Sequence, residues 1–263
     1  MSMPLLKVQR REDAVWLTMN SPGNMNALSL DMLSELESAV DALYADKSVR
    51  CVVLTGEGKA FSAGGDLRGF QSDLARSGAG QLIQRLQYAQ ELFGRIEKLP
   101  MPVIAAVNGY AIAGGLELLL CCDIVVAAES ARMGDGHARY GVIPAGGSSV
   151  RLPRKIAANR ANEMLLTGKL YPARMLEQWG LVNQVVEDAG LLAAASELAS
   201  RISALSPLGL KVIKELAGES LCRSPEDAAR AEIKAFEAYA LSADFAEGLA
   251  AFIEKRDPSF TGS

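Results

Sequence analysis

The sequence predicts an α/β fold with a largely parallel sheet, followed by a helical C-terminal region. Three continuous apolar runs, at residues 49–55, 102–107 and 123–128, have the composition of strands that are buried on both faces. Helical patterns separate these runs, and from about residue 154 strand signals nearly disappear. Strands that alternate with helices are typical of α/β domains. We therefore expect a core of residues 1–200 and a C-terminal helical region of residues 201–263.

The elements before the first buried strand follow from local patterns. Residues 5–9 and 14–19 are short β-like runs, and the Asn, Ser, Pro and Gly residues at 20–24 give a dense turn signal. Ser29 is a suitable N-cap for a helix that extends to about residue 46. The face of this helix that we expect to be buried carries Leu30, Leu33, Leu36 and Val40.

Beyond the first buried strand, helices dominate. A loop is expected at 56–59, and residues 181–186 are the one strand-like run after residue 154. Asp188 and Ser206 are suitable N-caps. No Gly/Ser-rich linker sets the last helices apart, so we expect them to pack against another surface. The helices are expected at residues 81–98, 188–205, 206–217, 225–241 and 242–255.

Composition excludes several classes of function. A net charge of −4 argues against a basic nucleic-acid-binding surface. The single histidine, His137, excludes multi-histidine metal centres, and no metal is expected. The four cysteines lack CxxC spacing, which favours a reducing compartment. The longest apolar run, residues 116–122, is too short to span a bilayer, and neither end carries a targeting signal. We expect a cytoplasmic enzyme without a membrane partner.

Three common ligand motifs are missing from the sequence. A dinucleotide fingerprint would need GxGxxG, and the candidate at residues 56–61 fails at its last position. Neither a phosphate-binding GxxxxGK[ST] loop nor a GxSxG nucleophile elbow is present. Nucleotide-dependent and serine-hydrolase chemistry are therefore not indicated.

Two glycine-containing loops are the informative segments. Residues 60–67 (AFSAGGDL) and 108–123 (NGYAIAGGLELLLCCD) each follow a predicted buried strand, where open α/β sheets bind ligands. Glycine lets the backbone approach a ligand closely, and the N–H groups at a helix start are unpaired. One N–H from each loop could grip a single carbonyl oxygen. Such an oxyanion hole is worth roughly 3 kcal/mol per donor and suits enolate chemistry next to a thioester.

Glu117 is the candidate acid or base beside this hole. It lies three residues after Gly114, on the same face of the first helical turn. Its neighbours in sequence are leucines, and apolar surroundings raise the pKa of a carboxyl group and suit it to general acid–base catalysis. The alternative is that Glu117 only complements the helix dipole or pairs with an arginine.

These segments together resemble the crotonase superfamily, that is, enoyl-CoA hydratases and isomerases. The similarity extends over nearly the whole chain and implies a ββα spiral core. It also implies an acyl-CoA thioester substrate, no cofactor beyond the coenzyme A of that substrate, and C-terminal helices that build a homotrimer or a hexamer (dimer of trimers). The matching segments are residues 24–28, 60–67, 106–123, 141–153 and 247–256.

The resemblance assigns roles to individual residues. Ala63 and Gly114 would donate the two oxyanion-hole N–H groups. Glu117 matches the first of the two catalytic glutamates of the hydratases, the one that helps to activate water. His137 stands where the second glutamate is expected. The residues implied in acyl-CoA binding are Asn26, Ala27, Ala63, Gly64, Gly65, Asp66, Leu67 and Gly114.

Two positions depart from the family pattern. A histidine at 137 can also move a proton, with an intrinsic pKa nearer neutrality, and it could pair with Glu117. Alternatively His137 is a loop residue that bonds to backbone. Ala145 stands where relatives that dehalogenate, close rings or shift dienes often use aspartate, which disfavours those activities.

Other polar candidates have competing interpretations. Asp66 is expected to fix its own loop rather than to perform chemistry. Cys121 and Cys122 are expected to be small buried residues. Arg68 and Lys255 either meet the phosphates of coenzyme A or are solvated.

Hydration and dehydration of a 2-enoyl-CoA in fatty acid metabolism is the primary hypothesis. The alternatives are hydrolysis, decarboxylation or isomerisation of a CoA ester with the help of His137, and a non-catalytic acyl-CoA-binding relative. Selection of the acyl group is expected to depend on a mobile segment at residues 71–80.

Overall fold

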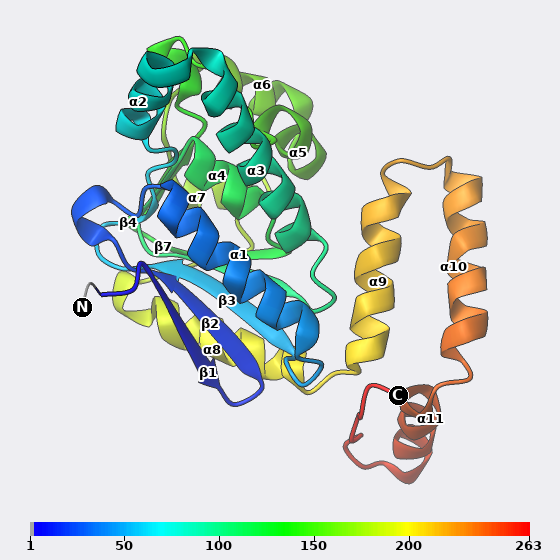
Figure 1. The fold of residues 1–263 in the computed structure, drawn as a ribbon. Helices are drawn as coiled ribbons and strands as arrows, with labels where there is room; N and C mark the ends of the chain where they lie inside the picture. The colour runs from blue at the N-terminus through cyan, green and yellow to red at the C-terminus, as the bar shows by residue number, and fades with distance from the viewer. Residues whose placement is uncertain (1–2) are drawn as a thin grey trace.

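The computed structural model describes residues 3–263 (Figure 1). It contains two sheets. The larger sheet has six strands in the order β1-β2-β3-β5-β7-β10. Its first two strands pair antiparallel, and all the remaining neighbouring strands pair parallel. The predicted α/β class with a largely parallel sheet is confirmed. The strands are β1 (Leu6–Arg11), β2 (Ala14–Met19), β3 (Cys51–Gly56), β5 (Val103–Val107), β7 (Ile124–Ala128) and β10 (Gln184–Val186).

The smaller sheet was not predicted. Its order is β4-β6-β8-β9, with β8 and β9 antiparallel. Each turn of the chain contributes one strand to each sheet, β3 then β4, β5 then β6, and β7 then β8. This alternation is the spiral that the family resemblance implied. Strands of two or three residues leave no period in the sequence, and these are β4 (Ala60–Ser62), β6 (Tyr110–Ile112), β8 (Arg132–Gly134) and β9 (Tyr171–Pro172).

Eight α-helices accompany the two sheets in the part of the chain that ends at residue 203. Ser29 caps the first, its Oγ accepting a hydrogen bond from the Met32 N–H at 3.2 Å. Within α1, Leu30 is exposed, contrary to expectation, because it begins the helix outside the buried face. These helices are α1 (Leu30–Ala45), α2 (Leu67–Ser77), α3 (Ala79–Glu97), α4 (Gly114–Leu120), α5 (Ser148–Lys155), α6 (Ala158–Thr167), α7 (Ala173–Gln178) and α8 (Leu191–Ser203).

The structure adds to one local expectation and contradicts another. The segment 71–80, which we expected to be mobile, forms the end of α2 and the start of α3. Asp188 does not cap α8, which begins at Leu191 after a short 3-10 helix at Asp188–Gly190. Instead the Asp188 carboxylate accepts a hydrogen bond from the Ser130 N–H at 3.0 Å. Asp188 therefore ties two loops together.

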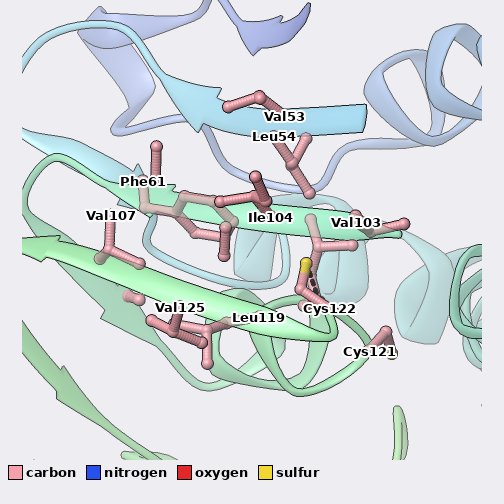
Figure 2. Close-up of a cluster of buried hydrophobic side chains, with 14 of the residues drawn as sticks. Val53, Leu54, Phe61, Val103, Ile104, Val107, Leu119, Cys121, Cys122 and Val125 are labelled. Carbon is pink, nitrogen blue, oxygen red and sulfur yellow. Dashed lines mark hydrogen bonds between the residues drawn. The ribbon is translucent and has the colours of Figure 1, made fainter. Parts of the chain in front are cut away.

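Part of the core lies between the central strands and α4. Figure 2 shows side chains of β3, β5 and β7 packed with Leu119, near the end of α4, and with Cys122, two residues after that helix. All seven residues of α4 are buried. A short helix that is enclosed on every side has little freedom to shift in a close-packed interior. The core therefore fixes the position of Gly114 and Glu117.

The C-terminal helices lie beside this two-sheet body (Figure 1). They are α9 (Pro207–Ser220), α10 (Pro225–Tyr239) and α11 (Ala243–Glu254), with Ser206, Ser224 and Ser242 as N-caps. Lys214 joins α9 to the body, because its Nζ lies 2.7 Å from Oδ2 of Asp123. None of the helices in residues 3–263 is long and apolar enough to cross a membrane.

Candidate active site

The site is built on a loop that Asn26 holds in place. The Asn26 side-chain amide donates to the carbonyls of Glu57, at 3.0 Å, and Ala60, at 2.7 Å, and its Oδ1 accepts from the Ser21 N–H at 2.8 Å. Asn26 is fully buried and has a left-handed backbone, with φ of +54°. Its polar atoms are used within the fold, so the prediction that Asn26 binds substrate is wrong. Its side chain ties the loop of residues 20–28 to the segment that leads into β4.

Of three backbone N–H groups that follow the short strands β4 and β6, one is hydrogen-bonded and two are free within the described chain. The Ala63 N–H donates to the Met25 carbonyl at 2.9 Å. Ala63 is therefore not available as an oxyanion-hole donor, and that prediction is wrong. Within residues 3–263, neither the Gly65 N–H nor the Gly114 N–H donates to another group. A Cβ placed on Gly114 would lie 3.3 Å from the Gly65 nitrogen, so these two free amides are neighbours.

One carboxylate oxygen of Glu117 is hydrogen-bonded within the protein, and the other has no donor among residues 3–263. Its Oε1 accepts hydrogen bonds from the Gly146 N–H at 2.8 Å and from the Ser148 N–H at 3.2 Å. No residue of the described chain donates to Oε2. Burial raises the pKa of Glu117, against the lowering effects of His137 and the two N–H groups. A positioned carboxyl group with a raised pKa can accept and return a proton.

His137 begins a 3-10 helix, His137–Tyr140, directly after the small sheet. Gly136 makes the turn with φ of +69°, a conformation that a side chain disfavours. The His137 Nδ1 atom lies 3.0 Å from Oδ2 of Asp135. Burial alone would lower the pKa of His137, but the carboxylates of Asp135 and Glu117 outweigh it and raise the pKa. The histidine therefore does not simply bond to backbone.

A cavity of about 420 Å³ joins these groups. Gly65, Gly114, Glu117 and His137 all line it. The remaining wall is largely apolar and comes from α2, α3 and the segment around residue 143, which suits a hydrocarbon chain. A larger cavity, of about 940 Å³, lies between α9 and α10 and has none of these four residues in its wall. The smaller cavity is therefore the candidate site.

The structure brings together only part of the predicted binding set. Ala63, Gly65, Leu67 and Gly114 line the cavity, while Asn26, Ala27, Gly64 and Asp66 do not. Ala145 lines it as well. Arg68 and Lys255 are exposed, and Cys121 and Cys122 are buried as predicted.

Sequence reasoning missed two sets of residues at this site. Asp135, fully buried behind His137, was not singled out, although it lies two positions before the one histidine of the chain. The apolar wall of the cavity was missed because α2 had not been identified as a helix. The 3–4-residue spacing of its apolar side chains was the available signal. The wall residues from α2 and α3 are Leu67, Phe70, Leu74, Leu82, Leu86, Ala89 and Phe93.

Known proteins that resemble this chain do so over nearly its whole length. The family model described as enoyl-CoA hydratase/isomerase matches residues 10–263. The 2,3-dehydroadipyl-CoA hydratase of Escherichia coli is 34% identical, over 99% of this chain and 100% of that protein. The crotonyl-CoA hydratase of Syntrophomonas wolfei is 35% identical, over 96% of each chain. The crystal structure of an enoyl-CoA hydratase from Bacillus anthracis superposes with a TM-score of 0.94 at 34% identity, covering 98% of this chain and 100% of that one.

Proposed function

We propose, because the chain belongs to the enoyl-CoA hydratase/isomerase family, that it hydrates a 2-enoyl-CoA and catalyses the reverse dehydration. One observation supports this most directly: two free backbone amides, a buried carboxyl group and an imidazole line one largely apolar cavity. In this proposal the amides of Gly65 and Gly114 bind the thioester oxygen, which becomes negatively charged as the enolate forms. Each donor is worth roughly 3 kcal/mol in the transition state.

Glu117 is the base for the attacking water in this mechanism. The N–H groups of Gly146 and Ser148 hold Oε1, which leaves Oε2 to accept a proton from water as its oxygen bonds to Cβ. His137, which lines the same cavity, exchanges the proton at Cα. The apolar wall from α2 and α3 excludes bulk water from the enolate.

The experiment is hydration of crotonyl-CoA and longer 2-enoyl-CoAs, followed by the loss of enoyl absorbance. Glu117→Gln keeps the size of the side chain and removes the base, so we expect a rate loss of about 100-fold or more. Glu237→Gln, on the exposed surface of α10, is the matched control and should keep the wild-type rate. A wild-type protein that is inert at every chain length, or a Glu117→Gln loss below about tenfold, would contradict the proposal.

The choice of Gly65 over Ala63 is tested by a structure with a bound acyl-CoA analogue. The thioester oxygen should lie about 3 Å from the nitrogens of Gly65 and Gly114, within hydrogen-bond range. The Ala63 N–H should still donate to Met25. An oxygen bound to the Ala63 nitrogen instead would show that this loop rearranges and that our assignment is wrong.

Hydrolysis of the thioester is the second candidate. The observation that favours it is an imidazole backed by a carboxylate, an arrangement that can activate water for attack on the carbonyl carbon. Release of free coenzyme A, detected with a thiol reagent, distinguishes hydrolysis from hydration. Loss of CO2 from the substrate, seen as a fall in its mass, would instead identify decarboxylation. Hydration releases no thiol and adds the mass of one water.

We also propose that the C-terminal helices assemble the chain into a homotrimer or a dimer of trimers. The support is uncovered apolar surface: Leu241, Phe252 and Ile253 are 89%, 84% and 76% exposed in the single chain. Large apolar side chains that gather at one end of a molecule are typical of an interface. Light scattering should give three or six times the chain mass of 27.9 kDa, and a monomeric mass would contradict this. A cytoplasmic location and the absence of a further cofactor remain predictions.

A further inference from the structure

Asp135 has an unusual environment for a carboxylate. Its side chain is 1% exposed, and Oδ2 lies 3.0 Å from Nδ1 of His137. Neither of its oxygens, nor Nδ1 of His137, makes a hydrogen bond of ordinary geometry within residues 3–263, so this 3.0 Å approach is the one polar contact of the carboxylate. A buried carboxylate that lacks donors is strongly destabilised, so its single polar neighbour has to supply the hydrogen. This requirement places a proton on Nδ1 of His137.

The His137 imidazole contacts Asp135 through one nitrogen, and its other side lines the cavity. Its Nδ1 atom is buried, while the ring as a whole keeps 12% of its surface exposed and lines the cavity. The chain reaches this position through Gly136, where an added Cβ would lie 2.8 Å from Cγ2 of Ile112. The backbone before the ring therefore has little room to shift. Since Nδ1 faces Asp135, Nε2 is the nitrogen that remains for a molecule in the cavity.

We propose that Asp135 is a positioning residue for His137: its carboxylate accepts the Nδ1–H and fixes the tautomer in which Nε2 exchanges a proton with the substrate. The pairing is a property of the fold, whereas its use in the reaction rests on the proposed hydration. A glutamate at this position would present a carboxylate. A histidine backed by Asp135 presents an imidazolium that can donate, or a neutral nitrogen that can accept.

The proposed step balances protons and electrons. The water oxygen bonds to Cβ and gives its proton to Glu117, while the π electron pair moves to Cα and the thioester oxygen. The enolate then takes the Nε2 proton of the His137 imidazolium, which forms the Cα–H bond. A proton returns from the Glu117 carboxyl group to Nε2 and restores the starting charges. Hydration thus needs His137 protonated and Glu117 ionised.

The charges that act on the ring come from two elements. Asp135 precedes it in the chain and Glu117 faces it from α4, and both favour the imidazolium form. Arg139 and Tyr140 belong to the same 3-10 helix. From α6, which packs against that helix, Arg160 and Glu163 pair with each other at 3.1 Å.

The direct test is the tautomer, and the chain allows it without resonance assignment because His137 is its only histidine. In protein labelled with ¹⁵N-histidine, long-range ¹H–¹⁵N spectra above the titration midpoint should show protonated Nδ1 and unprotonated Nε2. Protonated Nε2 would mean that Asp135 is itself the proton donor, and would overturn the proposal. Wild-type protein alone gives this answer, so it holds even if a variant fails to fold.

Asp135→Asn tests the same pairing by substitution. It removes the negative charge, so the His137 midpoint should move to lower pH and the neutral tautomer should switch to Nε2–H. Glu117→Gln is the matched control, because it also lowers the midpoint but should leave the tautomer unchanged. An Asp135→Asn protein with the wild-type midpoint and tautomer would show that the carboxylate does not act on the ring.

The kinetic consequence separates positioning from folding. If Asp135 acts through His137, Asp135→Asn should lower kcat/KM for crotonyl-CoA at least about tenfold. The alkaline limb of its pH profile should also move to lower pH. A merely structural defect would lower activity at every pH without moving that limb, and this result would overturn the proposed role. If no hydration is detected in wild type, the proposed function fails while the tautomer result still stands.

Discussion

The two-sheet body and the C-terminal helices differ in how closely their residues are enclosed. All seven residues of α4 are buried, whereas none of the 14 residues of α9 or the 15 residues of α10 is buried. In the body, each backbone position is fixed by its neighbours, which is what a site made of two amides requires. In the C-terminal helices, the sequence specifies helices and caps, but the chain does not cover their apolar side chains.

Glycines show this difference most directly. A Cβ on Gly115, the second residue of α4, would lie 2.1 Å from the Ser62 carbonyl oxygen. A Cβ on Gly218, near the end of α9, would have no heavy atom within 4 Å among the described residues. The same substitution should therefore have opposite consequences in the two regions, and each result tests one side of the comparison.

Gly115→Ala should give the largest effect. The new methyl group cannot be placed without moving the backbone at Ser62, so we expect a loss of about 3 kcal/mol or more in the free energy of unfolding. Because Ser62 leads into the loop that holds the Gly65 amide, hydration activity should fall as well. Urea denaturation measures the first effect and the crotonyl-CoA assay the second. Wild-type stability would show that α4 is less closely enclosed than described.

Glu117→Gln should have the next largest effect on stability, with the opposite sign. Burial raises the pKa of Glu117, so the folded protein holds this proton more tightly than the unfolded chain. The resulting stabilisation is present at pH below the unfolded pKa of 4.5 and is lost as the pH rises through the folded pKa. At neutral pH the buried, charged carboxylate therefore destabilises the fold, and glutamine should stabilise it by about 1 kcal/mol.

The measurement for this second prediction is urea denaturation of both proteins at neutral and acidic pH. The advantage of Glu117→Gln should shrink as the pH falls. Glu237→Gln, whose side chain is exposed on α10, is the control and should match wild type throughout. An advantage that grows in acid would mean that the pKa of Glu117 is lowered rather than raised. The expected result would show that Glu117, within the two-sheet body, is kept for function at a cost in stability.

The sequence was sufficient for elements that are long or apolar. The strands β3, β5 and β7 were predicted from apolar runs, and Ser29 and Ser206 from their capping chemistry, because these signals are local. The short strands of the second sheet were not predictable, since two or three residues have no detectable period. Asp188 was misassigned because its carboxylate has a partner, Ser130, that is far away in sequence.

The sequence indicated the kind of site that we propose, but not which atoms form it. The two glycine loops and Glu117 indicated an oxyanion hole next to a carboxyl group. Which amide is free depends on Met25, which accepts from Ala63 only after the loop held by Asn26 has folded against β4. Asp135 acts through its burial and its distance to His137, and neither is a property of the sequence pattern.

Gly218→Ala should give the smallest effect and tests the open side of the comparison. In the exposed last turn of α9, alanine loses less backbone entropy than glycine, so we expect a gain of about 0.5–1 kcal/mol in stability. Urea denaturation beside Gly115→Ala measures this gain. A loss of stability would mean that the added methyl group meets another copy of the chain at α9. The surface of α9 would then be open only in the single chain and enclosed in the assembly.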